Sequence, residues 1–182
     1  FAPAHADSTP QPLPFAQNWS NTALISVNDD WSGVPGFSGH RGDGLTASTG
    51  TDPQTLLAFG TSPVDVNANQ TNPNTFSTGG VTEFQLADPA VALTGSNTAA
   101  APFLLLALDT TGHSEIDVAY LLRDLDGSAD NAVQAVALQY RVGDSGDFSN
   151  LPAAFVADAT EGPSLAGKTT ADHGKFKELQ GP

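Results

Sequence analysis

Apolar side chains recur at every second position over several short stretches of this chain. Residues 81–86, 116–122 and 138–142 follow this pattern. Successive side chains of a strand point to opposite faces, so a period of two predicts strands with one buried face. Turn-forming residues, mainly glycine and Asn-Pro, separate these stretches, which fits short strands joined by loops.

Three further stretches are also predicted to be strands. Residues 24–27 and 90–93 are short apolar runs, and residues 103–108 are apolar on both faces, as in a central strand. A short helix is predicted only around residues 129–135. The sequence therefore predicts an all-β fold, specifically an antiparallel β-sandwich of jelly-roll type.

Composition divides the chain into three parts. Residues 1–14 contain four prolines, which predict an extended arm. Residues 15–165 form the predicted β-sandwich domain. Residues 166–182 contain all three lysines of the chain and are predicted to be a basic tail or linker.

The charge of the chain limits its partners. The formal net charge is −14, and only 14% of the residues are charged. Such a chain repels phosphate backbones, so nucleic-acid binding is not expected. The longest apolar run, residues 103–108, is far shorter than the roughly 18 residues of a membrane span, so membrane insertion is not expected either.

The chain contains no cysteine and no methionine. It therefore has no disulfides, no thiolate nucleophile and no cysteine-ligated zinc. A first residue other than methionine, with a composition rich in Asn, Thr, Ser, Gly and Ala, favours a secreted, extracellular bacterial protein from which a leader has been removed. A cytosolic acidic protein is the alternative.

Residues 124–130 carry oxygen-bearing side chains at every second position, namely Asp124, Asp126, Ser128 and Asp130. A turning loop can direct such a series at one calcium ion, which takes six to eight oxygen ligands. The spacing is not that of an EF-hand. A solvated acidic turn is the alternative.

Asp29 and Asp30 are adjacent carboxylates at the end of a predicted strand. They repel each other unless a cation or an arginine lies between them. The two residues are therefore candidates to complete a calcium site with the 124–130 loop. The alternative is an exposed loop in which water screens the repulsion.

Four residues are candidates for ligand binding. Arg41 and Asp43 belong to an Arg-Gly-Asp tripeptide, which adhesion receptors read in exposed loops; a plain turn or an Arg41–Asp43 contact is the favoured alternative. Trp19 and Trp31 are able to stack on sugar rings if they are exposed. A position in the core is favoured for Trp31, and both interpretations stay open for Trp19.

Recognisable catalytic motifs are absent from the sequence. The four histidines form no His-Glu-x-x-His pattern, and no Gly-x-Ser-x-Gly or phosphate-binding loop is present. These observations favour a protein without enzymatic activity. A metal-dependent hydrolase acting through an acidic site remains an alternative.

Residues 13–20, 24–36, 41–45 and 123–134 together resemble a β-sandwich domain of large secreted bacterial proteins. This domain type occurs beside extracellular endonuclease/exonuclease/phosphatase domains or lamin-tail domains. The resemblance covers about residues 13–165. It implies an extracellular jelly-roll module, accessory to an enzyme outside this chain, and carries over no catalytic residue.

The chain departs from that domain type after residue 165, where a closing Trp-x-Gly-x-Asp-Asp-Ile pattern is missing. The missing pattern would supply carboxylates to a calcium site, and its loss would leave a sheet edge open to strand addition.

The sequence therefore predicts a non-catalytic, secreted accessory module, stabilised by calcium, that binds carbohydrate or another extracellular surface component. The alternative is a structural subunit of an extracellular assembly, joined by exchange of edge strands.

Overall fold

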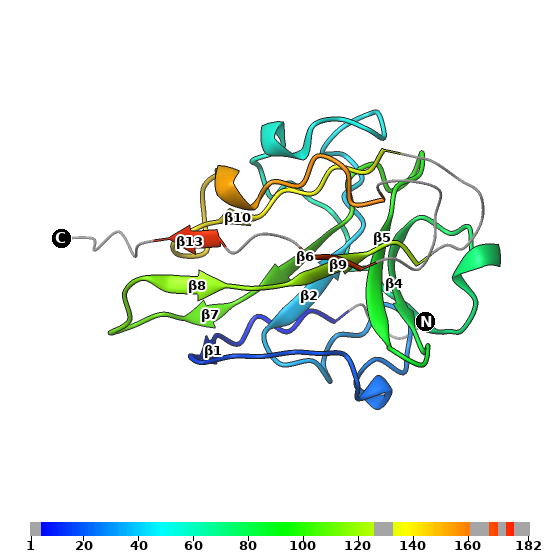
Figure 1. Cartoon of the computed structure of the whole chain (residues 1–182), viewed down its shortest axis with the longest axis horizontal. Coiled ribbons are helices and arrows are strands. Elements are labelled where there is room, and N and C mark those ends of the chain that lie inside the picture. Colours follow the sequence, from blue (N-terminus) through cyan, green and yellow to red (C-terminus); the bar gives the residue numbers. More distant parts are fainter. Residues whose placement is uncertain (1–4, 126–132, 161–167, 171–173, 177–182) are drawn as a thin grey trace. The chain divides into compact units, whose positions relative to one another are not determined.

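The computed structural model describes residues 5–125, 133–160, 168–170 and 174–176. The chain divides into two compact units (Figure 1). The first consists of Phe1–Thr49 and Gly60–Asp109, and the second of Gly50–Phe59 and Thr110–Pro182.

The first unit contains seven strands and two short 3₁₀ helices. They are β1 (Gln11–Pro12), η1 (Thr22–Leu24), β2 (Phe37–His40), β3 (Asn67–Gln70), η3 (Pro73–Thr75), β4 (Gly80–Phe84), β5 (Ala90–Thr94), β6 (Phe103–Leu106) and β7 (Leu108–Asp109). Strands β3, β4 and β5 form one sheet with β4 in the middle, β2 pairs with β6, and β1 pairs with β7. The β2–β6 register aligns Phe37 with Leu106 and His40 with Phe103.

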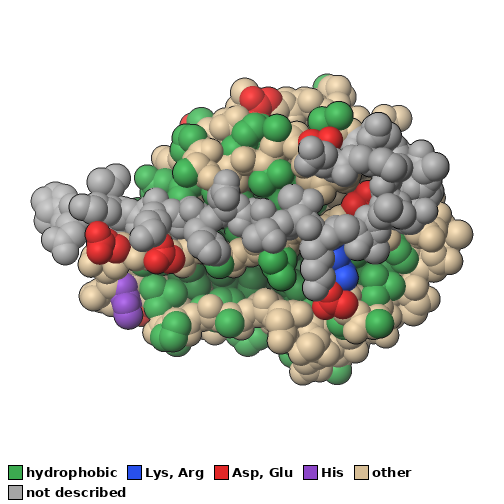
Figure 2. All heavy atoms as spheres, viewed as in Figure 1, with side chains coloured by type: hydrophobic (Ala, Val, Ile, Leu, Met, Phe, Trp, Pro, Cys, Tyr) green, Lys and Arg blue, Asp and Glu red, His purple; other side chains and the backbone are tan. Residues whose placement is uncertain are grey.

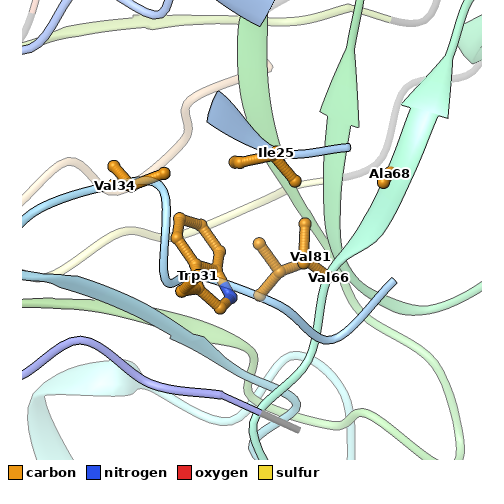
Figure 3. Packing of buried hydrophobic residues seen from close by; sticks show 6 residues of the cluster. All are labelled: Ile25, Trp31, Val34, Val66, Ala68 and Val81. Atoms are coloured by element: carbon orange, nitrogen blue, oxygen red, sulfur yellow. The ribbon is translucent and has the colours of Figure 1, made fainter. Parts of the chain in front are cut away.

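One hydrophobic core is shared by the β2–β6 pair and the β3–β4–β5 sheet. Its buried members are Ile25, Trp31, Val34, Val66, Ala68 and Val81. Figure 3 shows the Trp31 ring lying among the aliphatic side chains of this cluster. Phe37 of β2 and Leu104 of β6 pack against the same cluster as Val91 of β5. The β2–β6 pair and the β3–β4–β5 sheet therefore bury apolar side chains in a common core.

The central strand β4 is buried along its whole length. Its alternation predicts one exposed face, yet Glu83 on one face is only 4% exposed and Thr82 on the other is 0% exposed. In its sheet β4 has β3 on one side and β5 on the other, and β2 and β6 also lie against it. Burial of this strand is thus set by the elements around it rather than by its own pattern.

The second unit is built from η2 (Pro53–Thr55), β8 (Ile116–Val118), β9 (Leu121–Arg123), β10 (Gln139–Tyr140), β11 (Ser149–Asn150), η4 (Pro152–Ala154), β12 (Lys168–Thr170) and β13 (Gly174–Phe176). Its strands form antiparallel pairs: β8 with β13, β9 with β12, and β10 with β11.

Side-chain contacts tie residues 50–59 to the later part of the second unit. The Asn150 Nδ2 group donates to the Gln54 carbonyl at 2.7 Å. The Arg141 guanidinium lies over the rings of Phe59 and Phe148, with 5.8 and 4.6 Å from its central carbon to the ring centroids. Such cation–π contacts stabilise a pairing between distant parts of the sequence.

The all-β prediction is confirmed, because the described residues contain strands and short 3₁₀ turns but no α-helix. Strands occur in the predicted stretches 81–86, 90–93, 103–108, 116–122 and 138–142. No helix able to cross a membrane occurs among the described residues.

Three details of the prediction are wrong. Residues 24–27 form no strand, since the 3₁₀ helix η1 ends at Leu24. Ile25 is buried in the core and Leu24 packs against it, while Val27 is 45% exposed. Residues 133–135 are not helical, and the rest of the predicted helix lies outside the described residues. Pairing is not purely antiparallel, because β1–β7 and β3–β4 are parallel pairs.

Candidate functional site

The candidate site is the Arg41–Asp43 loop, which follows directly after β2 in the first unit. Arg41 Nη2 donates to Asp43 Oδ2 at 2.7 Å, and the two side chains are 39% and 35% exposed. Of the two predicted alternatives to receptor binding, the structure therefore contains the Arg41–Asp43 contact. A bond between the charged groups of the tripeptide occupies the groups that a receptor would need to reach separately.

The backbone of this loop is held at several points. Arg41 N donates to the Pro63 carbonyl at 3.1 Å, and Ser62 Oγ donates to the Asp43 carbonyl at 3.2 Å. Gly42 has a φ of +70°, and a Cβ at this position would collide with the Ala101 carbonyl oxygen. Glycine is required here both for the backbone conformation and for the close approach.

Two further carboxylates act on Arg41. Its pKa is raised first by the hydrogen bond to Asp43, and then by the charges of Asp43, Asp65 and Asp29. Arg41 thus belongs to a charged cluster, defined here as Asp29, Arg41, Asp43 and Asp65. The sequence treats Asp29 as a calcium candidate and the Arg41–Asp43 pair as a separate ligand-binding candidate. The structure places them in one cluster and adds Asp65.

Asp65 is held by the central sheet. Its Oδ2 atom accepts a hydrogen bond from Val81 N at 2.7 Å, and its side chain lies against Gly80, where a Cβ would collide with the carboxylate. Burial raises the pKa of Asp65, and the charges of Asp29 and Asp43 act in the same direction. The Val81 hydrogen bond and Arg41 oppose this rise.

The adjacent carboxylates of Asp29 and Asp30 accept hydrogen bonds from different backbone groups. Asp29 has a φ of +60°, and its Oδ1 atom accepts from Val66 N at 3.3 Å. Asp30 Oδ1 accepts instead from Ser32 N at 2.9 Å, and hydrogen bonds to Ser32 lower its pKa. Each carboxylate thus has its own backbone donor, which offsets part of the repulsion between Asp29 and Asp30.

The two tryptophans occupy different positions. Trp31 is 0% exposed, and its Nε1 donates to the Asp65 carbonyl at 3.1 Å. The Trp31 ring therefore has no exposed face in this structure, in agreement with the core position that the sequence favours. Trp19 is half-buried and packs edge-on against Trp31 and Phe37, with centroid distances of 6.4 and 5.1 Å.

The candidate calcium ligands are only partly described. Asp126, Ser128 and Asp130 lie outside the described residues, and Asp124 belongs to the second unit, whereas Asp29 and Asp30 belong to the first. Among the residues that the structure describes, no group of three or more His, Asp or Glu side chains is arranged to hold a metal ion. The calcium hypothesis therefore remains a prediction about the 124–130 loop.

A buried Ser38–His40 pair lies next to the charged cluster in the sequence. His40 Nε2 is 3.0 Å from Ser38 Oγ, and His40 Nδ1 is 3.2 Å from the Ser62 carbonyl oxygen. A carbonyl only accepts, so Nδ1 carries the proton and Nε2 accepts from the Ser38 hydroxyl. The pair resembles part of a hydrolase triad, but Ser38 and His40 are only 3% and 4% exposed.

His40 is further enclosed by Phe103, whose ring stacks on the imidazole with 4.9 Å between the centroids. Burial lowers the pKa of His40 and favours its neutral form. A Ser-x-His spacing on a strand is the signal that indicates such a pair, because alternate residues share one face.

Glu83 is a buried carboxylate that the sequence does not single out. Its Oε2 atom accepts from Asn69 N at 2.7 Å, where the β3–β4 register shifts. Burial raises the pKa of Glu83. The nearby Asn28 Oδ1 accepts from Ala68 N at 2.9 Å, so side chains satisfy backbone groups at this irregularity.

Comparisons with protein-family models, curated proteins and solved structures gave no match to this chain.

Proposed function

We propose that this chain is a secreted, non-catalytic accessory module with a jelly-roll-type β-sandwich, and that it binds carbohydrate at the Arg41–Asp43 loop. The observation that carries the proposal is the half-exposed ion pair on a loop fixed by hydrogen bonds and by Gly42. The all-β fold and the common core of the first unit support the sandwich architecture.

The chemistry of the pair suits a sugar. Neighbouring sugar hydroxyls both donate and accept hydrogen bonds, so they complement a guanidinium and a carboxylate held side by side. Arg41 Nε and Asp43 Oδ1 are buried and have no hydrogen-bond partner among the described residues. Contact with a sugar therefore falls to the exposed parts of the two side chains, which are 39% and 35% exposed.

The charge of the molecule favours a neutral ligand over an anionic one. The net charge is −14. On the described part of the face in Figure 2, red acidic side chains occur at several places, whereas blue basic side chains are confined to a small area. The negative potential of the molecule repels an anionic ligand but not a neutral polyol.

Burial of the Ser38–His40 pair supports a role without catalysis. A nucleophile must reach its substrate, and both side chains are enclosed by the core and by Phe103. Ser38 and His40 form a hydrogen bond with each other, and His40 forms another with the Ser62 carbonyl. Their buried polar groups are thus satisfied within the fold, which accounts for the pair as a structural feature.

A panel of neutral oligosaccharides, tested by calorimetry against the full chain, examines this proposal. We expect binding, and we expect Arg41→Ala and Asp43→Asn to weaken it by roughly ten- to a hundredfold, because a hydrogen bond to a charged group contributes about 1.5–3 kcal/mol. Asp147→Asn is the matched control, since Asp147 is an exposed carboxylate in the other unit.

Absence of binding across the panel would contradict the proposal. So would equal affinities for the wild type and the Asp43→Asn variant. Circular dichroism of each variant establishes that the fold is retained before the affinities are compared.

A further inference from the structure

The N-terminal arm, defined here as residues 5–12, lies in extended form on the first unit. His5 N donates to the Asp29 carbonyl and Trp31 N donates to the His5 carbonyl, both at 2.8 Å. Farther along, Gln11 N donates to the Ala107 carbonyl at 3.0 Å, and β1 runs parallel to β7 with Gln11 opposite Leu108. The arm therefore docks as an added strand at two places (Figure 1).

These contacts with the body are made mainly by the backbone of the arm. Most of its side chains are exposed; only Asp7 and Gln11 are partly buried. Gly36 permits the close approach, because a Cβ there would lie 2.5 Å from Gln11 Cγ and 3.3 Å from the Thr9 carbonyl oxygen. Main-chain hydrogen bonds of this type do not depend on which chain supplies the strand.

The arm satisfies a backbone group of the body. With the arm docked, Trp31 is fully buried and its backbone N–H has the His5 carbonyl as its partner. Docking of a strand here covers this N–H and supplies its hydrogen bond, which favours an occupied acceptor strip. We define the acceptor strip as Asp29–Trp31, Gly36 and Ala107–Asp109.

The arm is connected to the body by a stiff segment. Pro12 and Pro14 flank Leu13, and the next anchored residue is Phe15, whose ring lies 5.9 Å from that of Phe37. Proline restricts the backbone of this connection, in which the chain bends at residues 13–14. Eight extended residues reach roughly 25 Å, which is long enough to contact a neighbouring molecule.

We propose that the acceptor strip is a strand-exchange site, which a second copy of this chain fills with its own residues 5–12. The exchanged arm makes the same contacts as the intramolecular one, so only the connection at residues 13–14 differs between the two forms. The balance therefore depends on protein concentration relative to the effective concentration of the tethered arm. This inference is independent of the proposed carbohydrate site.

Engineered cysteines test the exchange directly, because the chain has none of its own. Gln11→Cys and Leu108→Cys are made in separate chains, which are mixed, unfolded, refolded at high concentration and oxidised. Paired positions on neighbouring strands fall within the range of a disulfide. We expect a covalent heterodimer, several times more abundant than from a mixture of Asp147→Cys and Leu108→Cys chains.

A chain carrying both Gln11→Cys and Leu108→Cys is the second measurement. At low concentration it should close within one molecule, and this crosslinked monomer should no longer exchange arms. Heterodimer yields no higher than in the control mixture, with closure of the double variant, would overturn the proposal. Failure of the double variant to close would also overturn it, because the arm would then not occupy the acceptor strip.

Discussion

At the scale of single residues, the Asp65 carboxylate is subject to opposing influences. Burial and the charges of Asp29 and Asp43 disfavour its ionised form, whereas the Val81 hydrogen bond and Arg41 favour it. The net effect raises its pKa above the ordinary value of 3.8. The folded state therefore binds a proton at Asp65 more readily than the unfolded state does.

This difference makes a pH prediction for Asp65→Asn. A raised folded pKa means that the wild type gains stability as the pH falls from above that value towards 3.8. Asparagine has no titrating carboxyl group and retains an oxygen for Val81 N. We expect the unfolding free energy of the variant, relative to the wild type, to fall as the pH decreases through this window.

Urea unfolding of both proteins at several pH values between 7 and 4 provides the measurement. Glu83 and His40 titrate in both proteins, so their effects cancel in the difference between the two. A difference in unfolding free energy between the variant and the wild type that does not change with pH would contradict the raised pKa of Asp65.

Asp65 also shows why part of the site was not predictable. It lies in the stretch Pro63-Val64-Asp65-Val66, which contains no local motif. It joins the charged cluster because the chain brings Val81, from the neighbouring strand β4, to its carboxylate. Arg41 and Asp43 were predictable candidates, since they are two residues apart and their contact is local.

At the scale of elements, the strand β2 depends on a glycine. Gly39 faces the indole ring of Trp31, and a Cβ at this position would collide with the ring and lie 2.8 Å from the Asp65 carbonyl oxygen. The side chains of Ser38 and His40 take part in the buried pair instead. The strand is thus fitted closely to the core residue beneath it.

Gly39→Ala is therefore expected to destabilise the protein by about 1–3 kcal/mol, the usual cost of overpacking a core. Gly95→Ala is the control, because a Cβ there meets only the Thr49 side chain, at 3.4 Å or more. Chemical unfolding measures both. Equal stability of the two variants would show that the core accommodates the extra methyl group.

Elements with alternating or consecutive apolar residues were predictable, and those without them were not. Alternation indicates β4, β8 and β10 correctly, and the apolar runs indicate β5 and β6. It misses β2 and β3, whose sequences Phe-Ser-Gly-His and Asn-Ala-Asn-Gln contain little apolar alternation. The partner of β2 is the distant strand β6, and β3 pairs in parallel with β4, the next strand along the chain, so pairing with another strand rather than local pattern makes strands of them.

At the scale of the whole molecule, the net charge of −14 opposes compaction. A bound divalent cation relieves part of this repulsion, which is the physical basis of the calcium hypothesis for the 124–130 loop. Ligands that bind only the folded state raise its stability in proportion to the logarithm of their concentration.

The full chain is therefore expected to melt at a higher temperature in calcium than in a chelator. The double variant Asp126→Asn/Asp130→Asn should lose most of this increase, while Asp147→Asn should retain it. Magnesium at the same concentration separates calcium binding from general screening of charge. Equal melting temperatures with calcium and with the chelator would exclude a stabilising calcium site.

The alternation of the chain between its two units affects how the protein can be cut. Residues 50–59 belong to the second unit but lie between two segments of the first. No single cut of the polypeptide separates the units, and a fragment that ends at residue 109 retains only a ten-residue piece of the second. During synthesis, the whole of the first unit therefore emerges from the ribosome before residues 110–182, with which residues 50–59 form the second unit.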